Sequence, residues 1–178
     1  MTNAGDLELR IDETAWNRLA DLEGLIIRSF EMAIAVGASL PDQTNGETTQ
    51  TITGATIVLS DDATLEQLNS QWRAKPKPTN ILSFPAPKGE KNDNGNRYLG
   101  DMILAYGVVV DEAAQQGKAL ETHLCHLVIH GALHLLGFDH LEIEEAEQME
   151  DHERAAMKAL NLPDPYLPVS AKQENAGK

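Results

Sequence analysis

Hydrophobic residues alternate with polar ones, or gather in short β-branched runs, at four places along the chain. This pattern is typical of strands with at least one buried face. The stretch 7–12 reads Leu-Glu-Leu-Arg-Ile-Asp, and the run from Thr51 to Leu59 is rich in Thr, Ile and Val. Two shorter stretches are Ile81–Phe84, which Pro85 ends because proline lacks a backbone N–H, and Tyr98–Ala105. The sequence therefore predicts about four strands, with 51–59 at the centre of the sheet.

Apolar residues at helical spacing occupy much of the remaining sequence. The segment 120–136 has Leu, Val and Ile nearly all around its circumference, so this helix is expected to be buried and central. The first helix is expected to run unbroken to about Val36 after an N-cap at Asp12 or Thr14. The predicted helical ranges are about 14–36, 61–72, 111–116, 120–136 and 142–160.

Strands mixed with helices in a chain of 178 residues predict an α+β fold, in which helices pack on a small mixed sheet of about four strands. A chain of this length can bury one sizeable core, so a single domain is expected over residues 1–167. The polar segments 37–50 and 86–97 are expected to be surface loops, and residues 168–178 a disordered tail.

The stretch from His130 to His140 carries the clearest chemical pattern in the chain. On a helix, His130 and His134 stand at positions i and i+4 and therefore project from one face. Gly137 permits the left-handed turn that ends a helix, after which His140 can return as a third nitrogen ligand. Three histidines leave the fourth position of a tetrahedral ion open, which is typical of a catalytic zinc site, although nickel or cobalt also suits such ligands.

The spacing of these histidines is that of the metzincin proteases, so the central helix is expected to be zincin-like. Those proteases require a glutamate directly after the first histidine as their general base. In this chain the residue at that position is Gly131. The sequence therefore predicts a catalytic metal centre without the base of a peptidase.

The formal net charge is −14, which by itself argues mildly against a nucleic-acid partner. Positive charge nevertheless gathers at Arg73, Lys75 and Lys77, and a local basic strip on an acidic protein can bind phosphates. The single cysteine, Cys125, excludes an intramolecular disulfide and is read as a small core residue. No apolar run approaches the roughly 18 residues of a membrane span, and no signal peptide is recognisable, so a cytoplasmic protein is expected.

Three segments, read together, resemble the YbeY family of bacterial endoribonucleases and ribosomal-RNA maturation factors. The segments are His130-Gly-x-Leu-His134-Leu-x-Gly-x-Asp-His140, Asn69-x-x-Trp-Arg73 with Pro78-Thr-x-Ile-Leu-Ser83-Phe-Pro85, and Leu99-Gly-Asp101-Met-Ile. The resemblance extends over roughly residues 50–167 in the order of the family. Two positions depart from it: Asn80 stands where the family usually has Asp, and Phe138 where it usually has Tyr.

The resemblance implies a mixed four-stranded sheet with helices, one bound zinc-like ion and cleavage of single-stranded RNA. It further implies maturation of the 3′ end of small-subunit ribosomal RNA and ribosome quality control, with the ribosome and its proteins as partners. The main alternative is a non-catalytic metal-binding factor of ribosome assembly. A metalloprotease, or a metal-dependent hydrolase of small molecules, ranks lower.

The residues suggest how the chemistry is divided. His130, His134 and His140 are expected to hold the ion, and His130 and Arg73 are assigned as catalytic. The Arg73 guanidinium can bind two phosphate oxygens and stabilise developing negative charge, and the resemblance points to the same arginine. Asp139 is a candidate to orient a histidine ligand, whereas no residue stands out as a general base.

Several other polar and aromatic residues near these motifs have two interpretations each. His123 and His126 lie on the same helical stripe as His130 and either contact metal or substrate or are satisfied polar residues. Ser83 is a substrate contact or an edge-strand hydroxyl, and Asp101 is a site acid or, as we favour, structural. Trp72 can stack on a base, but core packing is the interpretation we favour.

Overall fold

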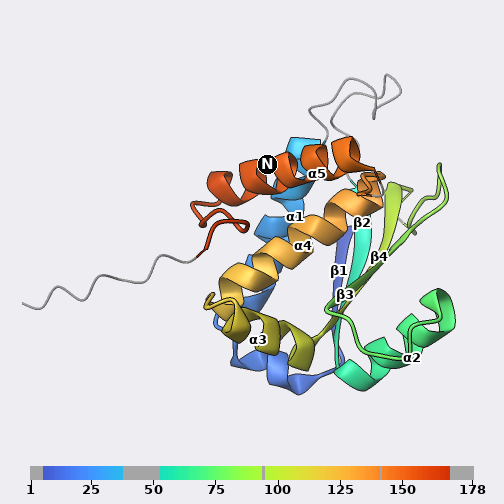
Figure 1. Ribbon diagram of the computed structural model, residues 1–178. Coiled ribbons are helices and arrows are strands. Elements are labelled where there is room, and N and C mark those ends of the chain that lie inside the picture. Colours follow the sequence, from blue (N-terminus) through green and yellow to red (C-terminus); the bar gives the residue numbers. More distant parts are fainter. Residues whose placement is uncertain (1–5, 38–52, 94, 141, 169–178) are drawn as a thin grey trace, which may run out of the picture.

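The computed structural model describes residues 6–37, 53–93, 95–140 and 142–168. A four-stranded sheet with the order β1-β2-β4-β3 forms its centre (Figure 1). Strand β2 pairs in parallel with both β1 and β4, whereas β3 is antiparallel to β4 and forms an edge. The strands are β1 (Leu7–Ile11), β2 (Thr53–Ser60), β3 (Ile81–Pro85) and β4 (Arg97–Ala105). The prediction of an α+β fold with a small mixed sheet is confirmed. Two predictions fall almost entirely on residues that the structure does not describe. They are the surface loop at 37–50, of which only residue 37 is described, and the tail at 168–178, of which only residue 168 is described.

The helices cover the sheet on two sides (Figure 1). They are η2 (Thr14–Arg18), α1 (Leu22–Gly37), α2 (Asp62–Arg73), α3 (Tyr106–Gln115), α4 (Leu120–Leu136) and α5 (Ile143–Ala159). One face carries the main core, in which α1, α4 and α5 pack on side chains such as Ile57 and Met102. On the other face, Leu65 and Leu68 of α2 pack on Leu82 and Phe84 of β3. None of the helices within the described residues is long and apolar enough to cross a membrane.

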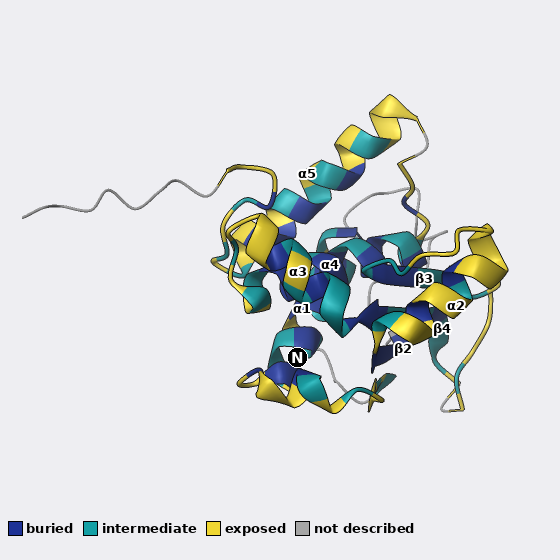
Figure 2. Cartoon of the chain, turned by 60° about the horizontal axis from the view of Figure 1, so that its bottom comes forward, coloured by how far each residue is buried: buried dark blue, intermediate teal, exposed yellow. Residues whose placement is uncertain are grey.

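Helix α4 is the central helix of the main core, as its all-round apolar sequence predicts. Its bounds agree with the predicted range 120–136. Figure 2 shows α4 largely buried, whereas α2 is exposed over much of its outer surface. The histidine-bearing helix therefore lies between the sheet and helices α1 and α5.

The prediction of one unbroken helix up to Val36 is wrong, because the segment contains two helices. The 3-10 helix Thr14–Arg18 ends before α1 begins at Leu22, and Asp21 between them adopts the left-handed conformation, with φ of 54°. The buried Trp16 holds the short helix in place by donating its Nε1–H to the Ser60 carbonyl at 3.0 Å. This long-range anchor turns the chain at a place where the local sequence shows no break.

Helix α3 begins at Tyr106, five residues before the predicted start at Asp111. The beginning of the helix contains three consecutive valines at 108–110, and β-branched residues favour strands. The sequence pattern therefore did not predict a helix there. The backbone N–H of Val108 donates to the Asp62 carboxylate at 3.1 Å, so a side chain from α2 satisfies a free N–H in the first turn of α3.

Candidate metal centre

Helix α4 ends in a turn that brings three histidines together. Gly137 adopts the left-handed conformation, with φ of 100°, and its N–H donates to the His134 carbonyl. The reversed chain then carries His140 back towards His130 and His134. One ring nitrogen of each histidine lies within 4.8 Å of the other two. The structure therefore brings together the three residues that the sequence predicted as ligands.

Hydrogen bonds fix the orientation of two of these imidazole rings. His130 Nδ1 donates to the Glu153 carboxylate at 2.7 Å, and His134 Nδ1 donates to the Phe138 carbonyl at 2.9 Å. With both Nδ1 atoms protonated, the lone pairs are on the Nε2 atoms, which lie 3.1 Å apart. Two Nε2 lone pairs 3.1 Å apart, with a ring nitrogen of His140 within 4.8 Å of both, are a donor set that fits a zinc-type ion.

The surroundings keep His134 in the neutral form that a metal requires. Burial and the neighbouring His130 lower the pKa of His134 to about 4. His140 is exposed, so the centre is open to solvent on that side. A site with one open side can admit a substrate.

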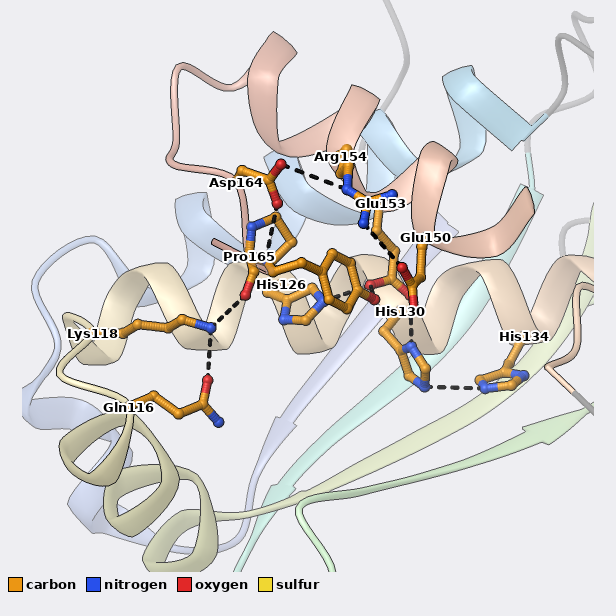
Figure 3. A network of polar contacts seen from close by, with 11 residues as sticks. Gln116, Lys118, His126, His130, His134, Glu150, Glu153, Arg154, Asp164 and Pro165 are labelled. Carbon is orange, nitrogen blue, oxygen red and sulfur yellow. Dashed lines mark hydrogen bonds and ion pairs between the residues drawn. The ribbon is translucent and has the colours of Figure 1, made fainter. Parts of the chain in front are cut away.

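Glu153 is the functional residue that the sequence interpretation missed. It lies on α5 with a side chain only 1% exposed, and it accepts hydrogen bonds from His126 at 2.5 Å, from His130 and from the Tyr166 hydroxyl (Figure 3). Burial by itself would raise the pKa of Glu153, but the hydrogen bonds from His126 and His130 lower it to about 2. Glu153 is therefore a buried carboxylate that orients the ring of His130, one of the three histidines of the cluster.

A signal for this role is present in the sequence. The buried residues of α5 are Met149, Glu153, Ala156 and Met157, spaced as one helical face. A glutamate in the middle of an apolar stripe must find a partner, because an unpaired buried charge is costly. Because α5 also carries many acidic residues on its exposed side, Glu153 was read as one more solvent-exposed acid.

Gly131 occupies a place where no side chain fits. A Cβ atom there would lie 2.5 Å from Met102 Sδ, 2.6 Å from Ile81 Cδ1 and 3.1 Å from Ser83 Oγ. Helix α4 thus approaches β3 and β4 too closely to carry the glutamate of a metzincin protease. Packing explains the glycine, and the missing glutamate removes the base that the protease interpretation needs.

Arg73 is not in contact with the histidines. It ends α2, which packs on the opposite face of the sheet from α4, and its side chain is exposed. Within the described part of the chain the Arg73 guanidinium forms no hydrogen bond or ion pair, and neither do the ammonium groups of Lys75 and Lys77. The edge strand β3 lies between this basic segment and α4 (Figure 1).

The prediction that Trp72, next to Arg73, packs in the core is wrong. Core packing was the interpretation favoured from the sequence, but the residue is 64% exposed. Its ring meets the Phe84 ring edge to face, with centroids 6.0 Å apart. Leu65 and Leu68 of α2 belong to the apolar cluster on this face of the sheet, whereas Trp72 meets only the Phe84 ring at its margin.

The remaining candidates have structural partners. Asp139 accepts from the backbone N–H of His140 at 2.8 Å, so it shapes the turn, while Glu153 orients His130. Asp101 accepts from the Tyr98 hydroxyl at 2.8 Å, which agrees with the structural role predicted for it. Cys125 is buried in the main core, as expected.

The comparisons with known proteins agree with this picture. A model of the family described as Endoribonuclease YbeY matches residues 29–161. A protein named Endoribonuclease YbeY from Rhodopseudomonas palustris (strain ATCC BAA-98 / CGA009) is 43% identical over 89% of this chain and 80% of its own. A protein of the same name from Novosphingobium aromaticivorans is 42% identical over 90% of this chain and 95% of its own. The chain belongs to the YbeY family.

Among solved structures, the solution structure of TM1509 from Thermotoga maritima has the same fold. The two share 22% sequence identity with a TM-score of 0.50, over 90% of this chain and 99% of that one. At this identity the likeness concerns the fold, and the family assignment depends on the sequence matches.

The two departures from the YbeY pattern are accommodated by local contacts. The Asn80 amide donates to the Glu112 carboxylate at 3.0 Å, and the same carboxylate accepts from His123 Nε2 at 2.9 Å. An aspartate at position 80 would repel Glu112, whereas the asparagine connects the segment after α2 to α3 and α4. Phe138 packs its ring against that of His152, with centroids 4.9 Å apart. His123 and His126 both bind carboxylates and lie outside the three-histidine cluster.

Proposed function

We infer that this protein is an endoribonuclease that processes ribosomal RNA, within a single ribonuclease domain formed by residues 1–167. One observation carries the inference: a chain of the YbeY endoribonuclease family presents three convergent histidines on α4 and the following turn. The relatives that match most of the chain are themselves named endoribonucleases.

We propose that His130, His134 and His140 hold one zinc ion, for which nickel or cobalt can substitute. The Nδ1 hydrogen bonds that orient the His130 and His134 rings support this assignment. When bound, such an ion supplies Lewis acidity towards a phosphate oxygen and lowers the pKa of water.

The protein groups divide the remaining work. His130 is a ligand held in one tautomer by Glu153. Arg73 supplies a guanidinium that has no partner among the described residues and can clamp a phosphate of the substrate. Gly131 offers no carboxylate to act as a base. Attack by the RNA's own 2′-hydroxyl would need no protein base, and attack by water is the alternative.

We further propose that the substrate is single-stranded, notably the 3′ end of small-subunit ribosomal RNA. The protein would then act in the cytoplasm together with the ribosome and ribosomal proteins. Family membership supports this setting, and the basic segment Arg73–Lys77 supports phosphate contacts.

The test is cleavage of a labelled single-stranded RNA, combined with metal analysis of the purified protein. We expect His134→Ala to lose both metal and cleavage. Arg73→Ala should retain the metal but lose roughly 10²-fold in turnover, because the RNA loses a phosphate clamp that positions it. Lys88→Ala, an exposed lysine outside the basic segment, is the matched control and should cleave normally.

Three results would contradict the proposal in different ways. Cleavage that persists in both variants indicates a contaminating nuclease. Loss of metal in Arg73→Ala indicates a structural role for that arginine. Metal and RNA binding without cleavage indicates a ribosome assembly factor that uses the ion for structure.

A further inference from the structure

Trp72 is a large aromatic residue that the fold leaves in solvent. At 64% exposed it contrasts with Trp16, the other tryptophan, which is completely buried. The edge-to-face contact with Phe84 positions the indole without covering it. Exposed aromatic rings of this kind are characteristic of surfaces on which bases stack.

The residues that follow Trp72 concentrate positive charge. Arg73, Lys75 and Lys77 are all exposed, and within the described part of the chain their side chains form no ion pair. They stand on a protein whose formal net charge is −14. A local group of unneutralised cations beside an exposed ring is complementary to a phosphate backbone with unpaired bases.

This basic segment is also held in a defined shape. Ala74 adopts the left-handed conformation, and the Lys75 N–H donates to the Asn69 carbonyl at 3.3 Å. The buried Asn69 side chain donates in turn to the Lys77 carbonyl at 2.8 Å. A preordered segment loses little conformational entropy when it binds.

The edge strand β3 connects this surface to the metal centre. The Phe84 side chain faces Trp72, while Ser83, one residue earlier, faces the opposite side of the sheet and lies against Gly131 beside His130. Two neighbouring residues of this edge strand therefore lie one on the Trp72 surface and one beside the histidine cluster. A single strand of RNA that crosses the edge at β3 can contact both places.

We propose that Trp72 is a stacking platform for an unpaired base of single-stranded RNA, with Arg73, Lys75 and Lys77 on the adjacent phosphates. The proposal depends on the RNA substrate inferred above and adds the site that binds it next to the cleavage centre. Removal of one stacked base contact costs roughly 5- to 150-fold in affinity.

The experiment uses the full chain and two independent signals. Anisotropy of a labelled single-stranded 2′-O-methyl RNA reports binding, and intrinsic tryptophan fluorescence reports contact with Trp72, because Trp16 is shielded in the core. We expect the RNA to quench the wild-type fluorescence. Trp72→Leu should lose the quenching and weaken binding roughly 5- to 150-fold, whereas Trp72→Phe should recover most of the affinity.

Leu167→Ala is the matched control, since Leu167 is 63% exposed and lies far along the chain, after α5. It should bind RNA as the wild type does. Normal binding by Trp72→Leu, or binding by the wild type without quenching, would overturn the stacking proposal and leave the endoribonuclease intact. Absence of RNA binding by the wild type in the anisotropy signal would count against the inferred function and the stacking site together.

Discussion

His130 on α4 donates its Nδ1–H to the buried carboxylate of Glu153 on α5, across 2.7 Å and 23 residues of sequence. The bond fixes which ring nitrogen keeps its lone pair. A carboxylate in this position behind a metal-ligand histidine also raises the basicity of the ligand. The arrangement of the three-histidine cluster therefore depends on two helices, although the three histidines come from one short stretch of chain.

Glu153→Gln should weaken metal binding by roughly 10–100-fold, the usual effect of losing such a partner. A glutamine can donate its amide N–H to His130 Nδ1, which would place the proton on Nε2 and remove the lone pair from the site. Titration of the metal-free protein with Co²⁺ or Zn²⁺ against a competing chelator measures the affinity. Glu150→Gln, which alters the neighbouring ion pair with Arg154, is the control. Equal affinities in both variants would contradict an orienting role.

Gly131→Ala should destabilise the protein by about 1–3 kcal/mol, the usual cost of overpacking a core. The added methyl group meets the Met102 side chain. Gly131→Ala should therefore cost less stability when it is introduced into the Met102→Ala variant than when it is introduced into the wild type. Urea unfolding followed by circular dichroism measures both effects. Unchanged stability of the single variant would mean that α4 can move away from the sheet.

Much of the centre was predictable because its determinants are local. The spacing of His130 and His134 and the helix-ending Gly137 lie within one stretch and predict the ligand cluster. The apolar patterns likewise predicted the number of strands and the bounds of α4. Local periodicity therefore accounts for the fold class and for the convergence of the three histidines.

What the sequence interpretation missed depends on partners far along the chain. Glu153 belongs to an acidic helix and becomes a site residue only when α5 packs on α4. The helix break at Asp21 depends on the hydrogen bond from the Trp16 indole to the Ser60 carbonyl. The early start of α3 depends on the Asp62 carboxylate, which accepts the Val108 N–H. Trp72 stays exposed because it meets the sheet only through the ring of Phe84, while Leu65 and Leu68 fill the contact between α2 and the sheet.

Cys125 should react slowly with thiol reagents while the protein is folded. Burial raises the pKa of this thiol above its ordinary value of 9.0, so the reactive thiolate is scarce at neutral pH. Because the folded pKa lies above the unfolded one, this group favours the folded state below pH 9 and loses that contribution as the pH rises further. Labelling rates in buffer and in urea measure the protection. Equally fast labelling in both would show that the thiol is accessible.

If the three histidines cleave RNA through one bound ion, as we propose, removal of that ion must abolish cleavage and its return must restore it. The protein is stripped with a chelator, its folding is checked by circular dichroism, and zinc is returned in measured steps. We predict that cleavage of single-stranded RNA disappears and then returns in proportion to bound metal, saturating at one ion per chain, whereas His134→Ala stays inactive throughout. Full cleavage by the folded, metal-free protein would show that the ion is not needed for the reaction.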